Sequence, residues 1–256
     1  MSEHPTNFWI TVRSLLIWSV AVLMLFSASS IAVISYPFRL HNFVHFLSRV
    51  FAKVMILFSG VRFHISGKEK LYRLEPIIVV SNHQSMFDAV GMYTFLDIPF
   101  RWVAKASLFR IPVFGLALKS AGYIPVERND PKKAVKSLFN AARDIQKGMS
   151  VVIFPEGTRS YDDGTMRPFK NGSFLLAKKA KVVIQPVTFW GSHKIIPVNK
   201  LNWLQRIYPG SVFITVHDPI HPEEYKDLSV DGISDLIKNV MEKSLYQMKS
   251  EIKRVS

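Results

Sequence analysis

Residues 76–95 read PIIVVSNHQSMFDAVGMYTF, and this stretch decides the fold. Pro76–Ser81 is a short run rich in β-branched apolar residues, which is typical of a buried strand. Ser85–Phe95 predicts a helix, because Ser85 and Asp88 form the S-x-x-D signal of a helix start. A strand, a polar turn and a helix therefore follow one another within twenty residues.

The same alternation of strands and helices continues to the end of the chain. Further strands are predicted at Phe100–Ala104, Gly122–Val126, Ser150–Phe154, Val182–Val187 and Val212–Val216. Further helices are predicted at Ser107–Ser120, with a break near Pro112, at Pro131–Lys147 and at Gly232–Arg254. Strands separated by helices indicate an α/β fold, with a mainly parallel mixed sheet covered by helices on both faces.

The N-terminal sixty residues have a different character and predict a pair of membrane-attaching helices. Leu15–Tyr36 contains no charged residue. A helix of this run would reach about 33 Å, enough for a hydrocarbon core of about 30 Å. In Phe43–Phe58 a polar residue recurs at every fourth position on an otherwise apolar helix, which favours a helix lying at the membrane interface. We therefore divide the chain into membrane-anchoring helices at 1–60 and an α/β domain at 61–256.

Two alternatives for this region stay open. A cleaved signal peptide would have a shorter apolar region, and no A-x-A site follows Leu15–Tyr36. The second helix can also be an ordinary buried helix with one wet edge. More basic residues follow the uncharged run than precede it, which predicts a cytoplasmic-membrane protein with residues 61–256 on the cytoplasmic side.

Composition narrows the classes of chemistry. The chain has no cysteine, which excludes disulfides, a thiolate nucleophile and Cys-ligated metal sites. The net charge is +14, of which +11 lies beyond residue 60. A basic domain attracts anionic lipids, nucleic acids or acidic proteins. We find no nucleic-acid-binding motif and expect membrane lipids as partners; the sequence does not determine the oligomeric state.

His83 and Asp88 are the first candidates for catalysis. Loops that leave the carboxyl ends of parallel strands usually build the site of such a sheet. Five residues apart, the two side chains can meet only if His83 lies in the turn and Asp88 in the first helical turn. Asp88 can then accept the ring N–H of His83, which gives a general base and its orienting carboxylate. The alternative is that Asp88 only caps the helix and His83 is a turn residue.

The second group of candidates follows the strand at Ser150–Phe154. Gly157 permits close approach to the backbone, and Arg159 offers a planar fork for a phosphate. Glu156 can accept from a substrate hydroxyl or hold Arg159. Lys105 and Arg128 each lie just past another predicted strand, so they are expected at the same edge, although either can be an ordinary surface charge.

Five motifs in order carry a family resemblance. They are NHQSMFD, KASLFRIPVFG, IPVER, FPEGTRS and IQPVTFWG, and they lie within residues 61–220. Together they resemble the glycerophospholipid acyltransferases, and among them the 1-acyl-sn-glycerol-3-phosphate acyltransferases of bacterial type. The resemblance implies an αβ acyltransferase domain preceded by membrane-attaching helices. It implies His83 and Asp88 as the catalytic H-x4-D pair, Arg128 as a phosphate contact, Pro186 within the last motif, and Glu156, Gly157, Thr158 and Arg159 as the acyl-acceptor loop.

The implied reaction moves a fatty-acyl group from acyl-CoA or acyl carrier protein to the sn-2 hydroxyl of 1-acyl-glycerol-3-phosphate (lysophosphatidic acid), giving phosphatidic acid. No metal and no cofactor beyond the thioester co-substrate is expected. An acyltransferase for another lysophospholipid or for glycerol-3-phosphate would share the same centre. The missing G-x-S-x-G motif argues against a hydrolase, and a 22-residue uncharged run argues against a non-enzymatic nucleic-acid-binding protein.

Overall fold

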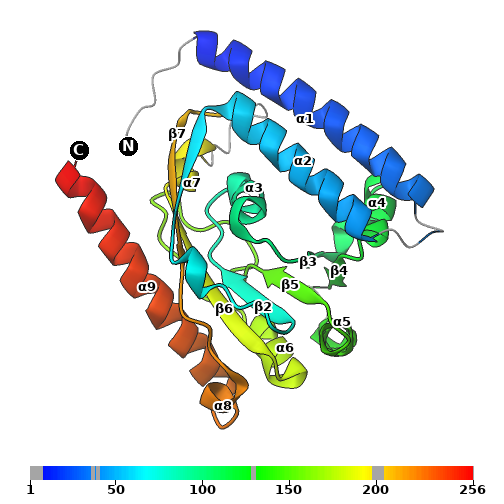
Figure 1. Ribbon diagram of the computed structural model, residues 1–256, viewed down its shortest axis with the longest axis vertical. Coiled ribbons are helices and arrows are strands. Elements are labelled where there is room, and N and C mark those ends of the chain that lie inside the picture. Colours follow the sequence, from blue (N-terminus) through cyan, green and yellow to red (C-terminus); the bar gives the residue numbers. More distant parts are fainter. Residues whose placement is uncertain (1–7, 36–37, 39–40, 128–130, 198–204, 256) are drawn as a thin grey trace.

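A computed structural model describes residues 8–35, 38, 41–127, 131–197 and 205–255 (Figure 1). The strands are β1 (Val61–Ser66), β2 (Ile77–Ser81), β3 (Phe100–Lys105), β4 (Ile124–Val126), β5 (Ser150–Ile153), β6 (Val183–Trp190) and β7 (Gly210–Val216). The α-helices are α1 (Phe8–Ser35), α2 (His41–Ser59), α3 (Met86–Phe95), α4 (Phe114–Ser120), α5 (Pro131–Gln146), α6 (Gly172–Ala180), α7 (Ser192–Ile195), α8 (Pro222–Tyr225) and α9 (Val230–Val255). Two short 3-10 helices are η2 (Lys68–Lys70) and η3 (Ala106–Arg110).

The described strands form one seven-stranded sheet in the order β1-β7-β6-β2-β5-β3-β4. Only the β6–β7 pair is antiparallel, and the other neighbouring pairs are parallel. The predicted mainly parallel mixed sheet is therefore confirmed. Strands β2 to β6 run in one direction, so their carboxyl ends lie along a single edge and bring the loops that follow them together.

Helices cover both faces of the sheet, as predicted (Figure 1). Alternate residues of β2 point to opposite faces: Ile78 and Val80 pack in a core with residues of α5, α6 and α9. Ile77 and Val79 pack on the other side with residues of α2 and α3. Each β2 side chain is completely buried, which explains why its sequence is apolar at consecutive positions rather than at every second one.

Strand β1 was not expected from the sequence. Its residues VRFHIS alternate between more and less buried positions, as an edge strand does, and β1 pairs with β7 alone. Six residues with three charged or polar outward positions give a weak apolar signal. Strand β6 is longer than predicted and extends to Trp190, which brings the segment after it to the edge where β2 and β5 end.

Helices α1 and α2 pack against each other, α1 also packs against α4, and α2 against α3. Polar contacts join α1 to the segment before β7. Arg13 donates from Nη2 to the carbonyl of Ile207 at 2.9 Å, and Trp18 donates from Nε1 to the carbonyl of Gln205 at 2.6 Å. The N-terminal helices are therefore held to the rest of the domain through α3, α4 and the segment before β7.

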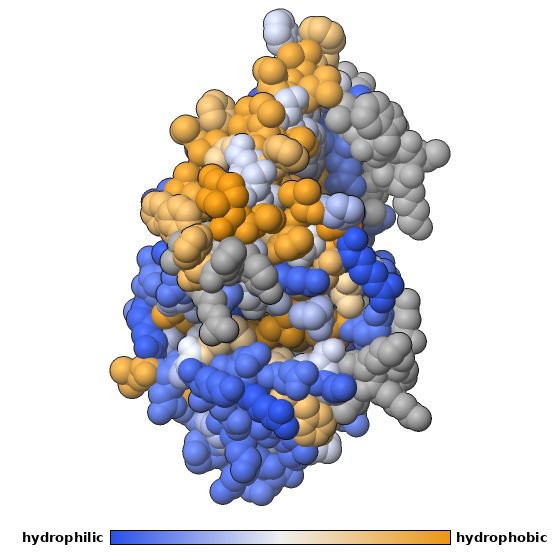
Figure 2. All heavy atoms as spheres, turned by 90° about the vertical axis from the view of Figure 1, so that its right-hand side faces the viewer, coloured by the Kyte–Doolittle hydropathy of each residue, from blue (hydrophilic) through white to orange (hydrophobic). Residues whose placement is uncertain are grey.

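Much of the apolar surface of these two helices is not covered by protein. Phe8–Ile34 and His41–Ser59 are long and apolar enough to cross a membrane. Side chains such as Leu16, Leu23 and Phe26 are more than 60% exposed. Figure 2 shows hydrophobic residues gathered over the upper part of one face, above a hydrophilic lower part. Exposed apolar surface of this extent favours association with a membrane.

Candidate active site

The loop between β2 and α3 is fixed at its start by Asn82. Its side-chain amide donates to the carbonyl of Phe189 at 2.9 Å and accepts from the Phe189 N–H at 2.7 Å. Both bonds are buried and join the end of β2 to β6. The loop therefore leaves the sheet from a rigid base, and the residue that follows it is His83.

The end of the same loop is fixed by the start of α3. Ser85 is the N-cap residue, and its Oγ accepts from the N–H of Phe87 at 3.3 Å. In the reciprocal hydrogen bond, Oδ2 of Asp88 accepts from the Ser85 N–H at 2.7 Å. This capping box confirms the S-x-x-D helix start predicted from the sequence.

The capping carboxylate also holds His83. The Nδ1 atom of His83 lies 3.0 Å from Oδ2 of Asp88, and the Asp88 side chain has no exposed surface. The other oxygen, Oδ1, accepts a hydrogen bond from the hydroxyl of Ser192, the first residue of α7. A buried carboxylate accepts only, so His83 donates from Nδ1 and its Nε2 is left as the basic nitrogen.

The His83 ring is also held by an aromatic neighbour. It stacks on Phe154, with ring centroids 4.1 Å apart and an interplanar angle of 11°. Phe154 in turn stacks on Trp102 at 5.4 Å. The His83 side chain keeps 22% of its surface exposed, so the ring is fixed in orientation yet open to a substrate.

The loop after β5 is joined to the His83 loop through Glu156. Its Oε1 accepts from the His83 N–H at 2.8 Å and from the Ser160 hydroxyl at 2.9 Å. Its Oε2 accepts from the Arg167 N–H at 2.7 Å. Burial raises the pKa of Glu156, and these three hydrogen bonds oppose the shift by stabilising the charged form. Both oxygens are thus used within the chain, and no ion pair with Arg159 is present among the described residues.

The next residues of this loop are more open. Gly157 adopts a left-handed φ of +67°, and a Cβ there would lie 3.1 Å from the side chain of Lys170. Thr158 is exposed. Arg159 is partly buried, its Nη1 has no hydrogen-bond partner among the described residues, and its carbonyl accepts from Nε of Arg167 at 2.8 Å. The Nη1 atom of Arg159 is thus buried without an acceptor, and a guanidinium is suited to an anionic one.

Lys105 and Arg128 are the two remaining residues that the sequence predicts at the site. Lys105 ends β3 and is exposed, at the carboxyl edge where His83 also lies. Arg128 lies outside the described residues. Among the described residues, no group of three or more His, Asp or Glu side chains is placed to hold a metal ion.

Comparison with known proteins identifies the family. A family model described as "Acyltransferase" matches residues 62–190, about half of the chain. The chain belongs to this acyltransferase family. The match runs from β1 to the last residue of β6, so it includes the strands whose loops carry His83, Asp88 and Glu156.

Individual relatives of this acyltransferase are similar over most of its length. A chloroplastic 1-acyl-sn-glycerol-3-phosphate acyltransferase of Arabidopsis thaliana is 37% identical over 72% of the chain, but the match covers 50% of that protein. The chain thus spans about half the length of the first curated relatives it matches. A 1-acyl-sn-glycerol-3-phosphate acyltransferase of Borreliella burgdorferi is 30% identical over 79% of each protein.

A solved structure has the same fold. The 1-acyl-sn-glycerophosphate acyltransferase of Thermotoga maritima superposes with a TM-score of 0.78 over 96% of this acyltransferase and 99% of that chain. The two sequences are 23% identical. The correspondence extends over the N-terminal helical pair as well as the sheet.

Sequence reasoning missed three side chains that complete the site of this acyltransferase. They are Asn82, Ser160 and Ser192. Ser192 follows β6 directly and contacts Asp88 across 104 residues of chain. Its position could have indicated this role, because Ser192 is a small polar residue just after a buried strand, at the sheet edge where the other site loops lie. The quoted motif around Pro186 stopped at Gly191, one residue short of Ser192.

Proposed function

We propose that this acyltransferase moves a fatty-acyl group from an acyl thioester to the sn-2 hydroxyl of 1-acyl-glycerol-3-phosphate, giving phosphatidic acid. The observation that carries the proposal is the His83–Asp88 pair, with Nδ1 and Oδ2 3.0 Å apart and 22% of the His83 side chain exposed. The names of the Arabidopsis and Borreliella relatives support the choice of acceptor.

In the proposed reaction His83 is the general base. Its Nε2 removes the proton from the acceptor hydroxyl, and that oxygen attacks the thioester carbonyl. The new C–O bond forms, the C–S bond breaks, and the departing thiolate takes the proton back from the His83 imidazolium. Asp88 stabilises the imidazolium and keeps the ring in one tautomer. No covalent acyl-enzyme is formed.

The proposed acceptor phosphate is held by Arg159, with Arg128 and Lys105 as further cations. The buried Nη1 of Arg159, which has no hydrogen-bond partner among the described residues, supports this assignment. Gly157 and Thr158 are proposed to line the acceptor path, where a glycine leaves the backbone accessible. Glu156 is proposed to act mainly by holding the His83 loop, since its oxygens already accept three hydrogen bonds.

The proposed setting is the cytoplasmic membrane, with the sheet on the cytoplasmic side. An amphiphilic acceptor stays in the bilayer, so an enzyme attached through α1 and α2 reaches it without extraction. We expect the full-length protein to stay with vesicles after a high-salt wash, because salt screens charge attraction but not apolar burial. Release by salt alone, measured by co-sedimentation, would show that α1 and α2 are not an anchor.

The decisive assay is transfer of a radiolabelled acyl group by the purified full-length protein. Acyl-CoA and acyl carrier protein are compared as donors. Acceptors are 1-acyl-glycerol-3-phosphate, glycerol-3-phosphate and a second lysophospholipid, which separates the proposed activity from its relatives. No cofactor is proposed, so a chelator should leave the rate unchanged.

A pair of histidine variants tests the mechanism in that assay. His83→Ala should lose nearly all transfer while the protein stays folded. His64→Ala is the matched control, because His64 is exposed on β1 and contacts Ser211 and Phe213 instead of the site. Normal turnover by folded His83→Ala protein would overturn the mechanism.

A further inference from the structure

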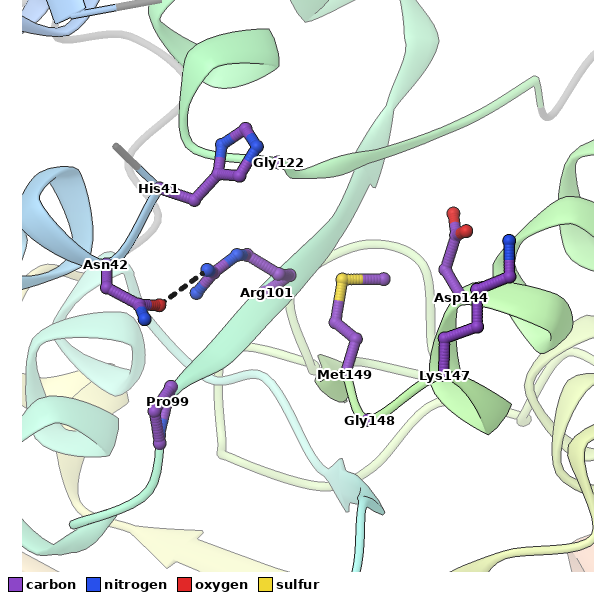
Figure 3. A pocket seen from close by; sticks show the side chains of 9 residues that line it. All are labelled: His41, Asn42, Pro99, Arg101, Gly122, Asp144, Lys147, Gly148 and Met149. Carbon is purple, nitrogen blue, oxygen red and sulfur yellow. Dashed lines mark hydrogen bonds between the residues drawn. The ribbon is translucent and has the colours of Figure 1, made fainter. Parts of the chain in front are cut away.

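A pocket lies at the opposite edge of the sheet from His83. Its volume is about 500 Å³, and it is lined by His41, Asn42, Pro99, Arg101, Gly122, Asp144, Lys147, Gly148 and Met149 (Figure 3). These residues sit at the amino ends of β3 and β5, at the start of α2 and at the end of α5. The pocket and the proposed active site therefore lie at opposite ends of the parallel strands.

Arg101 is the unusual residue of this pocket. Only 8% of its surface is exposed, yet both of its hydrogen-bond acceptors among the described residues are neutral: Nη1 donates to the carbonyl of Phe100 and Nη2 to Oδ1 of Asn42, both at 3.0 Å. No carboxylate forms an ion pair with it among the described residues. A buried cation without a counter-charge is costly, and an anion in the pocket would remove that cost.

Gly122 lets the backbone come close to Arg101 at the wall of the pocket. Gly122 has a left-handed φ of +72°, and a Cβ there would lie 3.1 Å from Nε of Arg101 and 3.6 Å from Nδ1 of His41. A side chain at this position would therefore crowd the Arg101 guanidinium, while Nδ1 of His41 already contacts the carbonyl of Ser120. Burial lowers the pKa of Arg101, the direction expected where a cation lacks an anionic partner.

The start of α2 adds a second favourable field. His41 is the first residue of this 19-residue helix, and no acidic residue occupies its first turn. The first backbone N–H groups of a helix have no intrahelical acceptor and carry partial positive charge. Lys147 lies on the facing wall, where it offsets the one acidic lining residue, Asp144 (Figure 3).

We propose that this pocket binds a phosphate group, with Arg101 and the first turn of α2 as its ligands. A guanidinium fork and a helix N-terminus are both suited to phosphate oxygens. The same helix exposes Phe43 and Phe46 within its first two turns. An anionic lipid headgroup, with its chains beside these side chains, is therefore the favoured source of the phosphate.

The test uses Asn42→Asp, a substitution designed to keep the protein folded. The new carboxylate would lie where Oδ1 of Asn42 already accepts from Arg101, and would give that guanidinium the counter-charge it lacks. We expect an unfolding midpoint at or above that of the parent in phosphate-free buffer. Binding of phosphate should weaken at least tenfold, because the added carboxylate neutralises Arg101 and repels the anion.

All proteins in this experiment carry Arg159→Ala, so that the proposed acceptor site does not contribute to the signal. Full-length protein in neutral detergent is titrated with inorganic phosphate, with micelles containing phosphatidic acid, and with phosphatidylcholine micelles, while thermal unfolding is followed. Asn239→Asp on α9 is the control, since it adds the same charge at an exposed site away from the pocket.

A midpoint that rises with phosphatidic acid and inorganic phosphate would show that the site recognises the phosphate itself. A rise with phosphatidic acid alone would show that it recognises the headgroup in a lipid surface. Either result supports the proposal if Asn42→Asp removes it and Asn239→Asp does not. The absence of any rise, or an equal rise in both variants, overturns the proposal without affecting the proposed acyl transfer.

Discussion

Replacing Ser192 by alanine removes one hydrogen bond from a carboxylate that has no contact with water. In the folded protein Asp88 accepts from Ser192 at Oδ1 and from His83 and Ser85 at Oδ2. Without the hydroxyl, Oδ1 has no remaining partner among the described residues, and alanine is too short to supply one. Ser192 therefore acts as a positioning residue, which works on the reaction only through Asp88.

The size of the effect follows from the charge of the acceptor. A hydrogen bond to a charged group contributes about 1.5–3 kcal/mol. If most of this is lost when the His83 imidazolium forms, the turnover number falls by roughly ten- to 150-fold. The Michaelis constant for the acceptor should stay nearly unchanged, because Ser192 touches no proposed substrate contact. The folded state should also lose stability, since a buried acceptor is left unpaired.

Acyl-transfer kinetics and urea unfolding on the same preparation separate these two effects. Ser173→Ala is the control, because Ser173 is a buried serine of α6 with no contact to Asp88. The control should lose some stability at most, with a normal turnover number. The reasoning is refuted if Ser192→Ala turns over at the rate of the parent, or if its defect lies in the acceptor Michaelis constant.

Substitutions at three other residues test the catalytic pair, the proposed phosphate contact and a buried histidine. Asp88→Asn should reduce acyl transfer by about four orders of magnitude, because the amide cannot stabilise the imidazolium. Urea unfolding should also show a loss of about 0.5–2 kcal/mol in the free energy of unfolding, because the helix cap is lost. A rate near that of the parent would contradict the role given to Asp88. Arg159→Ala should raise the Michaelis constant of the phosphate acceptor roughly ten- to 150-fold and that of the thioester far less, with partial recovery in Arg159→Lys; an equal rise in both constants would indicate general disruption. Burial lowers the pKa of His217 in the folded protein to about 4. As the pH falls, His217 therefore takes up a proton in the unfolded chain before it does so in the folded protein. The free energy of unfolding should drop by about 3 kcal/mol between about pH 6.5 and pH 4. In His217→Gln, urea unfolding across this range should show a shallower loss, and an unchanged slope would contradict the assignment.

The parts of the site that are local in sequence could be predicted, and the rest could not. His83 and Asp88 lie within one strand–turn–helix unit, so the helix-start signal made their contact possible, and the family resemblance favoured it over a cap alone. Their contact at 3.0 Å is the geometric result of that signal. Ser192 reaches the same carboxylate only because β6 is paired with β2 in a particular register, which no local pattern specifies.

Glu156 shows a different limit of sequence reasoning. A glutamate in a turn after a strand suggested either a substrate contact or a partner for Arg159. The structure places its oxygens against the N–H groups of His83 and Arg167 and the hydroxyl of Ser160. Backbone donors are the same at every position, so a sequence gives no indication that a carboxylate will bind them.

The fold shows the same division between local and distant information. Strands buried on both faces, such as β2, were found because their apolar runs are continuous. The edge strand β1 was missed because half of its residues face away from the core. The extent of β6 beyond Val187 was also missed. Its last three residues are held by antiparallel pairing with β7, which lies further along the chain, so no local pattern marks them as strand.

The double use of Asp88 explains why the spacing of the pair matters. One carboxylate oxygen accepts from both the His83 ring and the Ser85 N–H, so the start of α3 and the orientation of the base depend on the same atom. A shift of α3 along its axis by one residue would change the cap and move the imidazole together. Glu156 holds the His83 N–H from the other side at 2.8 Å, so the ring has a fixed backbone as well as a fixed partner. The base is thus oriented from two loops that belong to neighbouring strands, which makes its position a property of the sheet and not of either loop alone.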